Sequence, residues 1–441
     1  MTQAYREIAD LVAADIAAGR LRAGERLPTQ RRFARDRGIA ASTASRVYGE
    51  LVRRGLVVGE VGRGTFVRTA EPATEALAEP ARAGVDLELN FPILPGQAEL
   101  LAPSLEGLLR PDALATALRP ATVTGTKEAR EAAATLLTRP HWSPGAEHVV
   151  FAGNGRQALA AAVATLVGPG ERLGVEALTY PVMKGIAGRL GVTLVPLAMD
   201  DHGVEPTAVR AAGVRAVYLQ PTVHNPLGIT MPEHRRAELA AVLADLDLVA
   251  IEDMVNGFLE PAVTPLAALA PDHTILVDSL TKRLAPGLTA GFLVAPRRLV
   301  GGLSSAVRSG GWTAPAFALA AATRWIADGA VATIVRAKLD DAQARQRLAA
   351  ERLAGLTVKV NPRAYHLWWS LPAPWRAETF VGAAARRGIA VTPAAAFTVG
   401  PGQAPNAVRL ALASPPIEIL DQALETLVEL ARSTPDDTDH E

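Results

Sequence analysis

Lysine is scarce in this chain, which limits any chemistry that needs a primary amine. Of the 45 Lys and Arg residues, only five are lysines. Arginine stays protonated in proteins, so a nucleophilic amine among these cations has to come from a lysine. The candidates are Lys127, Lys184, Lys282, Lys338 and Lys359. Lys282 follows the apolar run Thr274–Val277, which has the pattern of a buried β-strand.

The chain contains no cysteine, which excludes disulfide bonds, thiolate nucleophiles, thiolate zinc sites and iron–sulfur clusters. We expect no metal site. The longest uncharged apolar stretch, Gly310 to Thr323, is too short to span a bilayer. The N-terminus soon reaches Glu7 and Asp10 and has no signal-peptide pattern. We therefore expect a cytoplasmic protein that does not enter a membrane.

A glycine-rich turn in the middle of the chain could bind a phosphate group. Residues Phe151–Gln157 pass from a predicted strand, Val149–Ala152, into a predicted helix. Backbone N–H groups at the start of a helix attract anions. Asn154, Gly155 and Arg156 are therefore candidate phosphate-binding residues, although glycine is also common at strand-to-helix turns that bind nothing.

Other polar residues follow predicted strands. Asp253 comes at the end of the apolar run Leu248–Ile251, and both Asn225 and Ser279 follow strands of the same kind. Ligands of open α/β sheets collect at the carboxyl ends of the strands.

The first 69 residues are strongly basic. They carry thirteen arginines, no lysine and seven acidic residues, a net charge of about +6 in a chain whose total charge is zero. The apolar pattern predicts helices over 5–18, 29–38 and 42–55, followed by a hairpin of strands at 56–58 and 65–67. Three helices and a hairpin make a winged helix-turn-helix, and its positive charge indicates a nucleic-acid contact at this end of the chain.

The third helix carries the residues that would enter a major groove, namely small hydroxyls and Arg46. Arg31 on the preceding helix is placed to reach a phosphate or a guanine edge. The glycine-rich wing, 61–65, brings one cation, Arg63, beside the minor groove. The alternative is a small basic protein-interaction domain, but the arginine-rich face together with the wing favours DNA.

This head resembles the DNA-binding domain of the GntR family of bacterial regulators. The resemblance rests on Gly24–Arg31, Thr43–Leu51 and Gly55–Val67 and covers nearly all of residues 5–68. The DNA contacts that it implies, taken together with the wing cation, are Arg31, Ser42, Thr43, Arg46, Arg63 and Gly64.

Four segments are predicted along the chain. Residues 1–69 form the winged helix-turn-helix, and residues 70–88 hold Pro, Ala and Glu without a useful period, as linkers do. Residues 89–432 alternate apolar strands with Ala-rich helices, which predicts a mainly parallel, doubly wound α/β sheet. After about residue 355, shorter strands and two helices predict a small C-terminal α+β subdomain. Residues 433–441 are acidic and expected to be disordered.

Residues 150–290 resemble the fold-type-I aminotransferases, which use pyridoxal 5'-phosphate. The resemblance rests on Phe151–Gln157, Asn225–Gly228, Asp253 and Asp278–Leu288 in this order. Each motif alone could be a turn, a helix cap or a surface lysine. Their order and spacing together predict the aminotransferase-like fold.

The same resemblance implies a role for each candidate residue. Lys282 would be the Schiff-base lysine, Asp253 would pair with the pyridine nitrogen, and Asn225 would donate to the phenolic oxygen of the ring. Tyr180 would stack on the ring, and Arg409 would bind the carboxylate of an effector in a bidentate manner. The implied phosphate ligands are Asn154, Gly155, Arg156 and Ser279.

A GntR-type winged helix, a linker and an aminotransferase-like domain together resemble the MocR subfamily of transcriptional regulators. The resemblance covers essentially the whole chain. It implies a regulator that binds a double-stranded DNA operator, senses a small amine, an amino acid or a metabolite related to pyridoxal phosphate, and forms a head-to-tail homodimer. No catalytic residue is expected in such a domain.

The chain departs from the aminotransferase pattern at three places. The family's tyrosine after the pyridine-binding aspartate is replaced, since Val255 and Asn256 stand there. Thr289 occupies the position of a phosphate-binding arginine, and residues 111–130 contain no tyrosine that could reach a neighbouring subunit's phosphate. Each charge-assisted hydrogen bond lost costs about 1.5–3 kcal/mol. Arg156 and Arg283 are the candidates to compensate.

These departures leave two other functions open beside the ligand-responsive regulator. One is a working aminotransferase with an attached DNA-binding domain, which the missing ligands argue against. The other is a regulator whose aminotransferase-like domain no longer binds pyridoxal phosphate. The retained Lys282, Asp253 and Asn225 favour cofactor binding.

Overall fold

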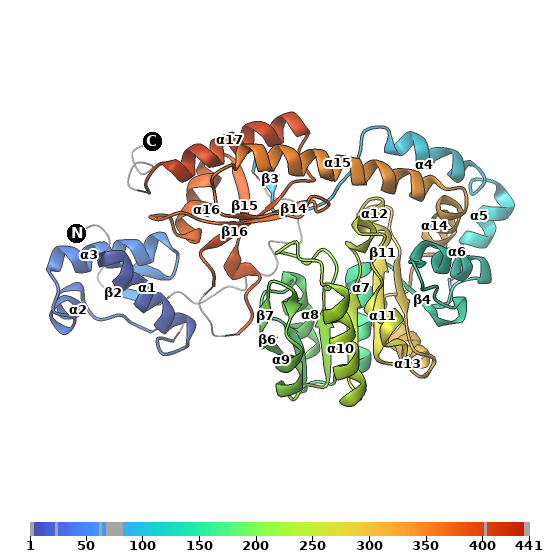
Figure 1. Ribbon diagram of the computed structural model, residues 1–441, viewed down its shortest axis with the longest axis horizontal. Helices are drawn as coiled ribbons and strands as arrows, with labels where there is room; N and C mark the ends of the chain where they lie inside the picture. The colour runs from blue at the N-terminus through green and yellow to red at the C-terminus, as the bar shows by residue number, and fades with distance from the viewer. Residues whose placement is uncertain (1–3, 23–24, 61–63, 68–82, 401–403, 436–441) are drawn as a thin grey trace.

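The computed structural model describes residues 4–22, 25–60, 64–67, 83–400 and 404–435. Figure 1 shows an N-terminal winged helix, a large subdomain and a small subdomain. The long helix α15 (Ala330–Arg352) runs from the outer helices of the large subdomain to the small one. Most of the predicted linker and residues 436–441 of the predicted tail lie outside the described ranges.

The winged helix has the predicted order of elements, with small shifts at their ends. Its helices and strands are α1 (Ala4–Ala17), α2 (Gln30–Asp36), α3 (Ala41–Arg53), β1 (Val57–Glu60) and β2 (Gly64–Val67). The side chain of Thr29 caps α2 by accepting a hydrogen bond from the Arg32 backbone at 3.4 Å. The apolar face of α3 packs in one cluster with α1, and the rings of Phe33 and Tyr48 meet edge to face at 5.3 Å.

The large subdomain is built on a seven-stranded sheet in the order β4-β12-β11-β10-β9-β5-β6. Neighbouring strands are parallel except for β12, which is antiparallel to both β4 and β11. The mainly parallel sheet confirms the predicted α/β class. The strands are β4 (Val149–Ala152), β5 (Arg172–Glu176), β6 (Thr193–Leu197), β9 (Ala216–Leu219), β10 (Val249–Asp253), β11 (Thr274–Ser279) and β12 (Gly291–Val294), with a small hairpin of β7 (Met199–Asp200) and β8 (Gly203–Val204).

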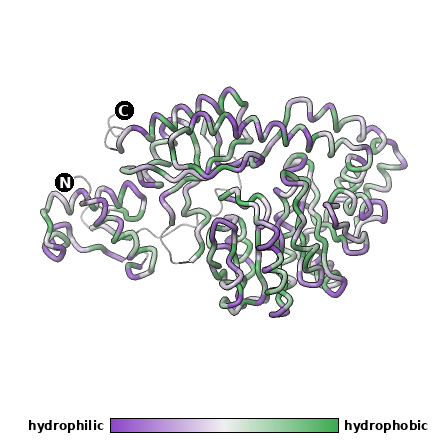
Figure 2. Tube along the Cα trace, in the orientation of Figure 1, coloured by the Kyte–Doolittle hydropathy of each residue, from purple (hydrophilic) through white to green (hydrophobic). Residues whose placement is uncertain are grey.

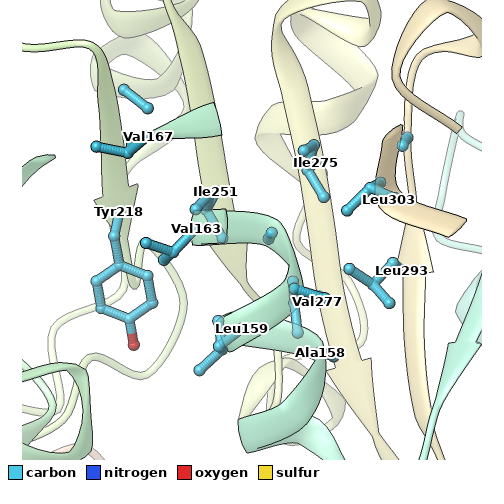
Figure 3. Packing of buried hydrophobic residues seen from close by; sticks show 14 of the residues in the cluster. Ala158, Leu159, Val163, Val167, Tyr218, Ile251, Ile275, Val277, Leu293 and Leu303 are labelled. Carbon is cyan, nitrogen blue, oxygen red and sulfur yellow. The ribbon is translucent and has the colours of Figure 1, made fainter. Parts of the chain in front are cut away.

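The helices of the large subdomain lie on both faces of this sheet or pack against helices that do. They are α4 (Gln97–Glu106), α5 (Pro111–Ala117), α6 (Lys127–Leu137), α7 (Gly155–Leu166), α8 (Pro181–Leu190), α9 (Pro206–Ala211), α10 (Glu233–Asp245), α11 (Leu266–Leu269), α12 (Leu280–Arg283), α13 (Arg297–Ser309) and α14 (Ala316–Ala327). Figure 3 shows α7 beside the strands, with Val163 next to Ile251, and Leu159 and Val277 belong to the same buried cluster. Burying such side chains contributes about 1.5–3 kcal/mol each, so this layer fixes where α7 begins.

The small subdomain has a five-stranded sheet in the order β13-β14-β16-β15-β3. Its elements are β3 (Val85–Leu87), β13 (Val358–Lys359), β14 (His366–Ser370), α16 (Ala377–Arg386), β15 (Ile389–Pro393), β16 (Ala407–Ala411) and α17 (Ile417–Arg432). Strand β3 lies inside the range predicted as linker, 70–88. The sequence did not indicate it because its partner is the remote strand β15, with Ile389 paired to Val85.

One carboxylate joins the winged helix to the small subdomain. Asp10 on α1 accepts hydrogen bonds from Arg54 at the end of α3 (2.7 Å) and from Nε of Arg376 (3.0 Å), the residue before α16. Arg54 also donates to the buried Glu50 at 2.9 Å. Figure 1 shows the winged helix beside α16 accordingly. Ser42, Ser45 and Arg46 on α3 remain exposed to solvent.

Polar and apolar residues alternate along most of the chain, as the tube in Figure 2 shows. In the described part of the chain, no single helix has the length and hydropathy of a membrane span. Only α14 and α15 taken together meet that criterion, and they are bent by 73° relative to each other.

Candidate functional site

A cavity of about 420 Å³ opens at the carboxyl ends of the large sheet, where the small subdomain closes over it. All nine residues predicted for the cofactor and effector line this cavity. They are Asn154, Gly155, Arg156, Tyr180, Asn225, Asp253, Ser279, Lys282 and Arg409. Eight of them belong to the large subdomain, where strand ends and the following turns bring them together, and Arg409 comes from β16 of the small subdomain.

Lys282 reaches into the cavity from the short helix α12. Its Nζ donates a hydrogen bond to the carbonyl oxygen of Asn90 and lies 4.1 Å from the ring centroid of Phe91. Burial of the amine, and then the charges of Arg409, Arg156 and Lys338, lower its pKa to about 7. A large fraction of Lys282 is therefore neutral near neutral pH, and a neutral amine is the nucleophilic form.

Asp253 lies at the end of β10 and is nearly enclosed. It accepts hydrogen bonds from the hydroxyl of Tyr218 (2.7 Å) and from the backbone N–H of Val255 (3.1 Å). Burial raises the pKa of Asp253 to about 6 in spite of these hydrogen bonds. A cation placed against this carboxylate would stabilise its charged form.

One end of the cavity has the form of an anion cradle. The Asn154 side chain caps α7 by accepting a hydrogen bond from the Gln157 backbone at 3.0 Å. A Cβ atom on Gly155 would lie 3.0 Å from the Ser279 hydroxyl, so glycine here lets the turns before α7 and α12 approach closely without displacing that side chain. Arg156 donates through Nε to the Tyr180 hydroxyl at 3.3 Å.

The wall that the small subdomain contributes to the cavity holds a buried cation. Arg409 donates to the Glu88 carbonyl, to the Thr392 hydroxyl (2.9 Å) and to Oδ1 of Asn225 (3.5 Å). Its Nε has no hydrogen-bond partner among the described residues. Burial lowers the pKa of Arg409 to about 10, so the side chain remains charged at neutral pH. An anionic ligand would offset the cost of this burial.

The predicted DNA contacts among the described residues lie on α2, on α3 and at the start of β2. Arg31, Ser42 and Arg46 are exposed, and Thr43 is half-buried on the same face of α3. Gly64 has a φ of +123°, and a Cβ atom there would lie 2.6 Å from Nε of Arg26. The glycine thus gives Arg26 room to pack on the wing. Arg63 lies outside the described residues.

Family models match both parts of the chain. The model of aminotransferase class I and II matches residues 114–427, and that of the gntR family of bacterial regulatory proteins matches residues 4–67. The probable rhizopine catabolism regulatory protein MocR of Rhizobium meliloti is 26% identical, over 75% of this chain and 73% of its own. The chain belongs to the MocR subfamily. It is therefore a DNA-binding transcriptional regulator of the GntR family with an aminotransferase-like domain.

Another regulator matches this MocR-subfamily chain over nearly its whole length. The uncharacterized HTH-type transcriptional regulator YdeF of Bacillus subtilis is 29% identical, over 96% of this chain and 93% of its own length. Solved aminotransferases share the fold of the large and small subdomains. The Pyrococcus horikoshii kynurenine aminotransferase, solved with PMP, superposes with a TM-score of 0.72 at 21% identity, over 82% of this chain and 95% of its own.

Two of the three departures from the aminotransferase pattern, and one candidate to compensate for them, can be followed in this MocR-type domain. Asn256 lines the cavity, but its side-chain amide donates to the Val223 carbonyl at 3.3 Å. The hydroxyl of Thr289 is hydrogen-bonded to that of Thr281 at 2.7 Å. Arg283 is buried beside Asp278 and does not line the cavity, so it cannot replace the missing phosphate cation.

Sequence reasoning missed several residues of the cavity wall. Glu88, Asn90 and Phe91 line it together with His366, whose pKa burial lowers to about 3. The first three come directly after the unpredicted β3, and no local pattern marks them. Within the described residues, no group of His, Asp or Glu side chains could hold a metal ion.

Proposed function

We propose that this regulator binds pyridoxal 5'-phosphate in the cavity between its subdomains and uses the loaded site to sense a small amine or amino acid. The observation that carries the proposal is the single cavity that unites Lys282, Asp253 and the turn before α7. When bound, the cofactor supplies an electrophilic carbon and an electron-withdrawing ring. The protein would act on a double-stranded DNA operator as a head-to-tail homodimer.

The residues present fit the cofactor at three points. Asp253, fixed by the Tyr218 hydroxyl, offers a carboxylate to a protonated ring nitrogen. Gly155, which has no Cβ atom, lies against Ser279 and leaves room for a phosphate at the backbone N–H groups that begin α7. Lys282 has a partly neutral amine within the same cavity. Together these groups fit a phosphorylated pyridine that carries a carbonyl group.

Arg409 supports an effector that carries a carboxylate. Its guanidinium is enclosed at the small-subdomain end, and Nε still lacks a partner among the described residues. An amino acid with its amino group near Lys282 and its carboxylate near Arg409 would contact both subdomains. If the subdomains can adopt two relative arrangements, such a ligand shifts the equilibrium between them. The size of this shift is set by the difference in its affinity for the two arrangements.

We further propose that the domain regulates rather than catalyses. Asn256 has its amide directed at the Val223 carbonyl, and Thr289 is engaged with Thr281, so neither supplies the charge or acidic hydroxyl that the family uses. The site retains groups that bind and orient a ligand but has fewer groups that stabilise a changing charge. A regulator requires only the former.

The test is cofactor loading of the wild type, Lys282→Ala and Lys184→Ala. Lys184 is a matched control, since burial also lowers its pKa, to about 8, but it does not line the cavity. Wild type and Lys184→Ala should gain a visible absorbance band with pyridoxal phosphate. Borohydride reduction should then attach the cofactor to the Lys282 peptide. Loading of Lys282→Ala equal to that of wild type, or no loading of any variant, would contradict the proposal.

DNA titrations of the same variants test the sensing step. Lys282→Ala should bind operator DNA with nearly the wild-type affinity, because α12 does not contact the winged helix. It should lose the response to cofactor and to candidate amines. In the wild type, the effector should change DNA affinity by about 1–3 kcal/mol. An identical response of both proteins would show that sensing does not use Lys282.

A further inference from the structure

The phosphate end of the cavity lacks the arginine that the aminotransferase pattern places at position 289. Thr289 there forms a hydrogen bond with Thr281, and the buried Arg283 is paired with Asp278 outside the cavity. A doubly charged phosphate held only by backbone N–H groups and hydroxyls would lack the bidentate hydrogen bonds, with a full opposite charge, that a guanidinium provides. A cation is therefore needed elsewhere on this wall.

We propose that Arg156 is this cation, so that the phosphate-binding charge has moved from position 289 to the first turn of α7. The inference rests on the proposed function, because it concerns the phosphate of the same cofactor. Arg156 lines the cavity together with Gly155, Ser279 and Thr289. Arg156 comes directly after Gly155, which has no Cβ atom and so leaves room for a phosphate next to Ser279.

The position of Arg156 is unfavourable for a cation unless an anion is near. The N-terminus of a helix carries a partial positive charge, so an arginine in the first turn is repelled by the helix that it belongs to. The first turn of α7 contains no acidic residue that would compensate. A phosphate bound at this end would pair with both the helix and the guanidinium.

The guanidinium of Arg156 also has N–H donors that are available to a ligand. Nε of Arg156 donates to the Tyr180 hydroxyl at 3.3 Å, which directs the side chain along the cavity wall. Within the described part of the chain, no hydrogen bond or ion pair involves its two terminal nitrogens. These are the nitrogens with which a guanidinium binds two oxygens of one phosphate. Arg156 is close enough for its charge to lower the pKa of Lys282.

A purely structural role for Arg156, holding Tyr180 in place, makes a different prediction. Tyr180 lies where the ring would stack, so its displacement would weaken ligands with and without a phosphate alike. Loss of a phosphate cation weakens only the phosphorylated ligand. Pyridoxal, which lacks the phosphate, therefore separates the two roles.

The experiment measures the dissociation constants of pyridoxal phosphate and pyridoxal for the full chain, by absorbance titration. Arg156→Gln should weaken pyridoxal phosphate at least about tenfold, as expected for a lost charge-assisted hydrogen bond, and pyridoxal less than about twofold. Arg189→Gln, an exposed arginine on α8 outside this cavity, is the matched control and should change neither. Thr289→Arg added to Arg156→Gln should restore most of the affinity for pyridoxal phosphate.

Thermal melting without ligand supplies a second readout. Arg156→Gln should melt no lower than the wild type, because it removes a cation from the positive end of α7. Equal weakening of pyridoxal phosphate and pyridoxal, or unchanged affinity for pyridoxal phosphate, would overturn the assignment while leaving the proposed function intact. Failure of the wild type to bind either compound would overturn both.

Discussion

The buried Lys338 should make the stability of this protein rise with pH. It lies on α15, and its Nζ donates to the carbonyl oxygens of Lys282 (2.9 Å) and Leu284 (2.6 Å). A neutral amine has just two N–H donors, which these carbonyls satisfy, whereas protonation adds a charge and a further donor. Burial lowers the pKa of Lys338 from 10.5 to about 7.

The direction of the pH effect follows from proton binding. Between pH 7 and 10.5 the unfolded chain keeps the Lys338 proton that the folded protein has lost, so the free energy of unfolding increases with pH in this window. One pKa unit corresponds to about 1.4 kcal/mol, and the shift from 10.5 to about 7 amounts to roughly 5 kcal/mol across the window. Lys338→Met keeps an apolar stem of similar length and removes the titrating group.

The assay is denaturant unfolding of wild type and Lys338→Met between about pH 7 and about pH 9. The difference in unfolding free energy should grow by about 1 kcal/mol per pH unit. Lys338→Met should also be less stable throughout, by about 1–3 kcal/mol, because two carbonyls lose their donor. Lys359→Met, a surface lysine paired with Asp201, should follow the wild-type profile. Parallel profiles of wild type and Lys338→Met would refute this reasoning.

Three further predictions concern DNA binding, domain docking and turnover. Arg46→Ala should weaken binding to a specific operator by about 1–3 kcal/mol and relax base preference at one position, measured against a scrambled duplex. Asp10→Asn should lower the melting temperature of the winged helix, because Arg54 and Arg376 then face each other without a carboxylate. Burial raises the pKa of Asp10, but hydrogen bonds and charges of Arg376 and Arg54 lower it by more, so its pKa lies below the ordinary value of 3.8. The stabilisation by ionised Asp10 is therefore present above pH 3.8 and is lost as the pH falls through the lowered pKa. Steady-state transamination with any amino donor should stay well below about 1 per second, and ordinary enzyme rates would contradict a regulatory role.

The sequence predicted the cavity well where local order determines it. Asp253 and Ser279 end β10 and β11, and Asn154 comes two residues after β4. These three strands point the same way in one sheet, so their carboxyl ends meet at one edge. Their convergence therefore follows from the alternation of strands and helices alone. The winged helix was predictable for a similar reason, since its helices, turns and hairpin are all set by short-range patterns.

The rest of the site depends on contacts between distant residues. Lys282 donates a hydrogen bond to the carbonyl of Asn90, which is 192 positions away in the sequence. Lys338 donates to the carbonyl of Lys282, which is 56 positions away. Asp10 and Arg376 are 366 residues apart. No periodicity links such pairs, because packing of whole subdomains brings them together. Composition also gives no sign that Lys338 and Arg409 are enclosed, since both residue types are usually exposed.

The hydrogen bond from Lys282 to the Asn90 carbonyl connects the site to the segment through which the chain leads back to the DNA-binding domain. Asn90 lies three residues after Leu87, the end of β3, and the chain before β3 leads back to the winged helix. The adjacent carbonyls of Glu88 and Leu89 accept hydrogen bonds from Arg409 and Ser414. A ligand that engages Lys282 and Arg409 takes donors away from this one strip of backbone. Ligand binding would thus weaken the hydrogen bonds that hold the backbone of residues 88–90, and so change how this segment is fixed to the aminotransferase-like domain.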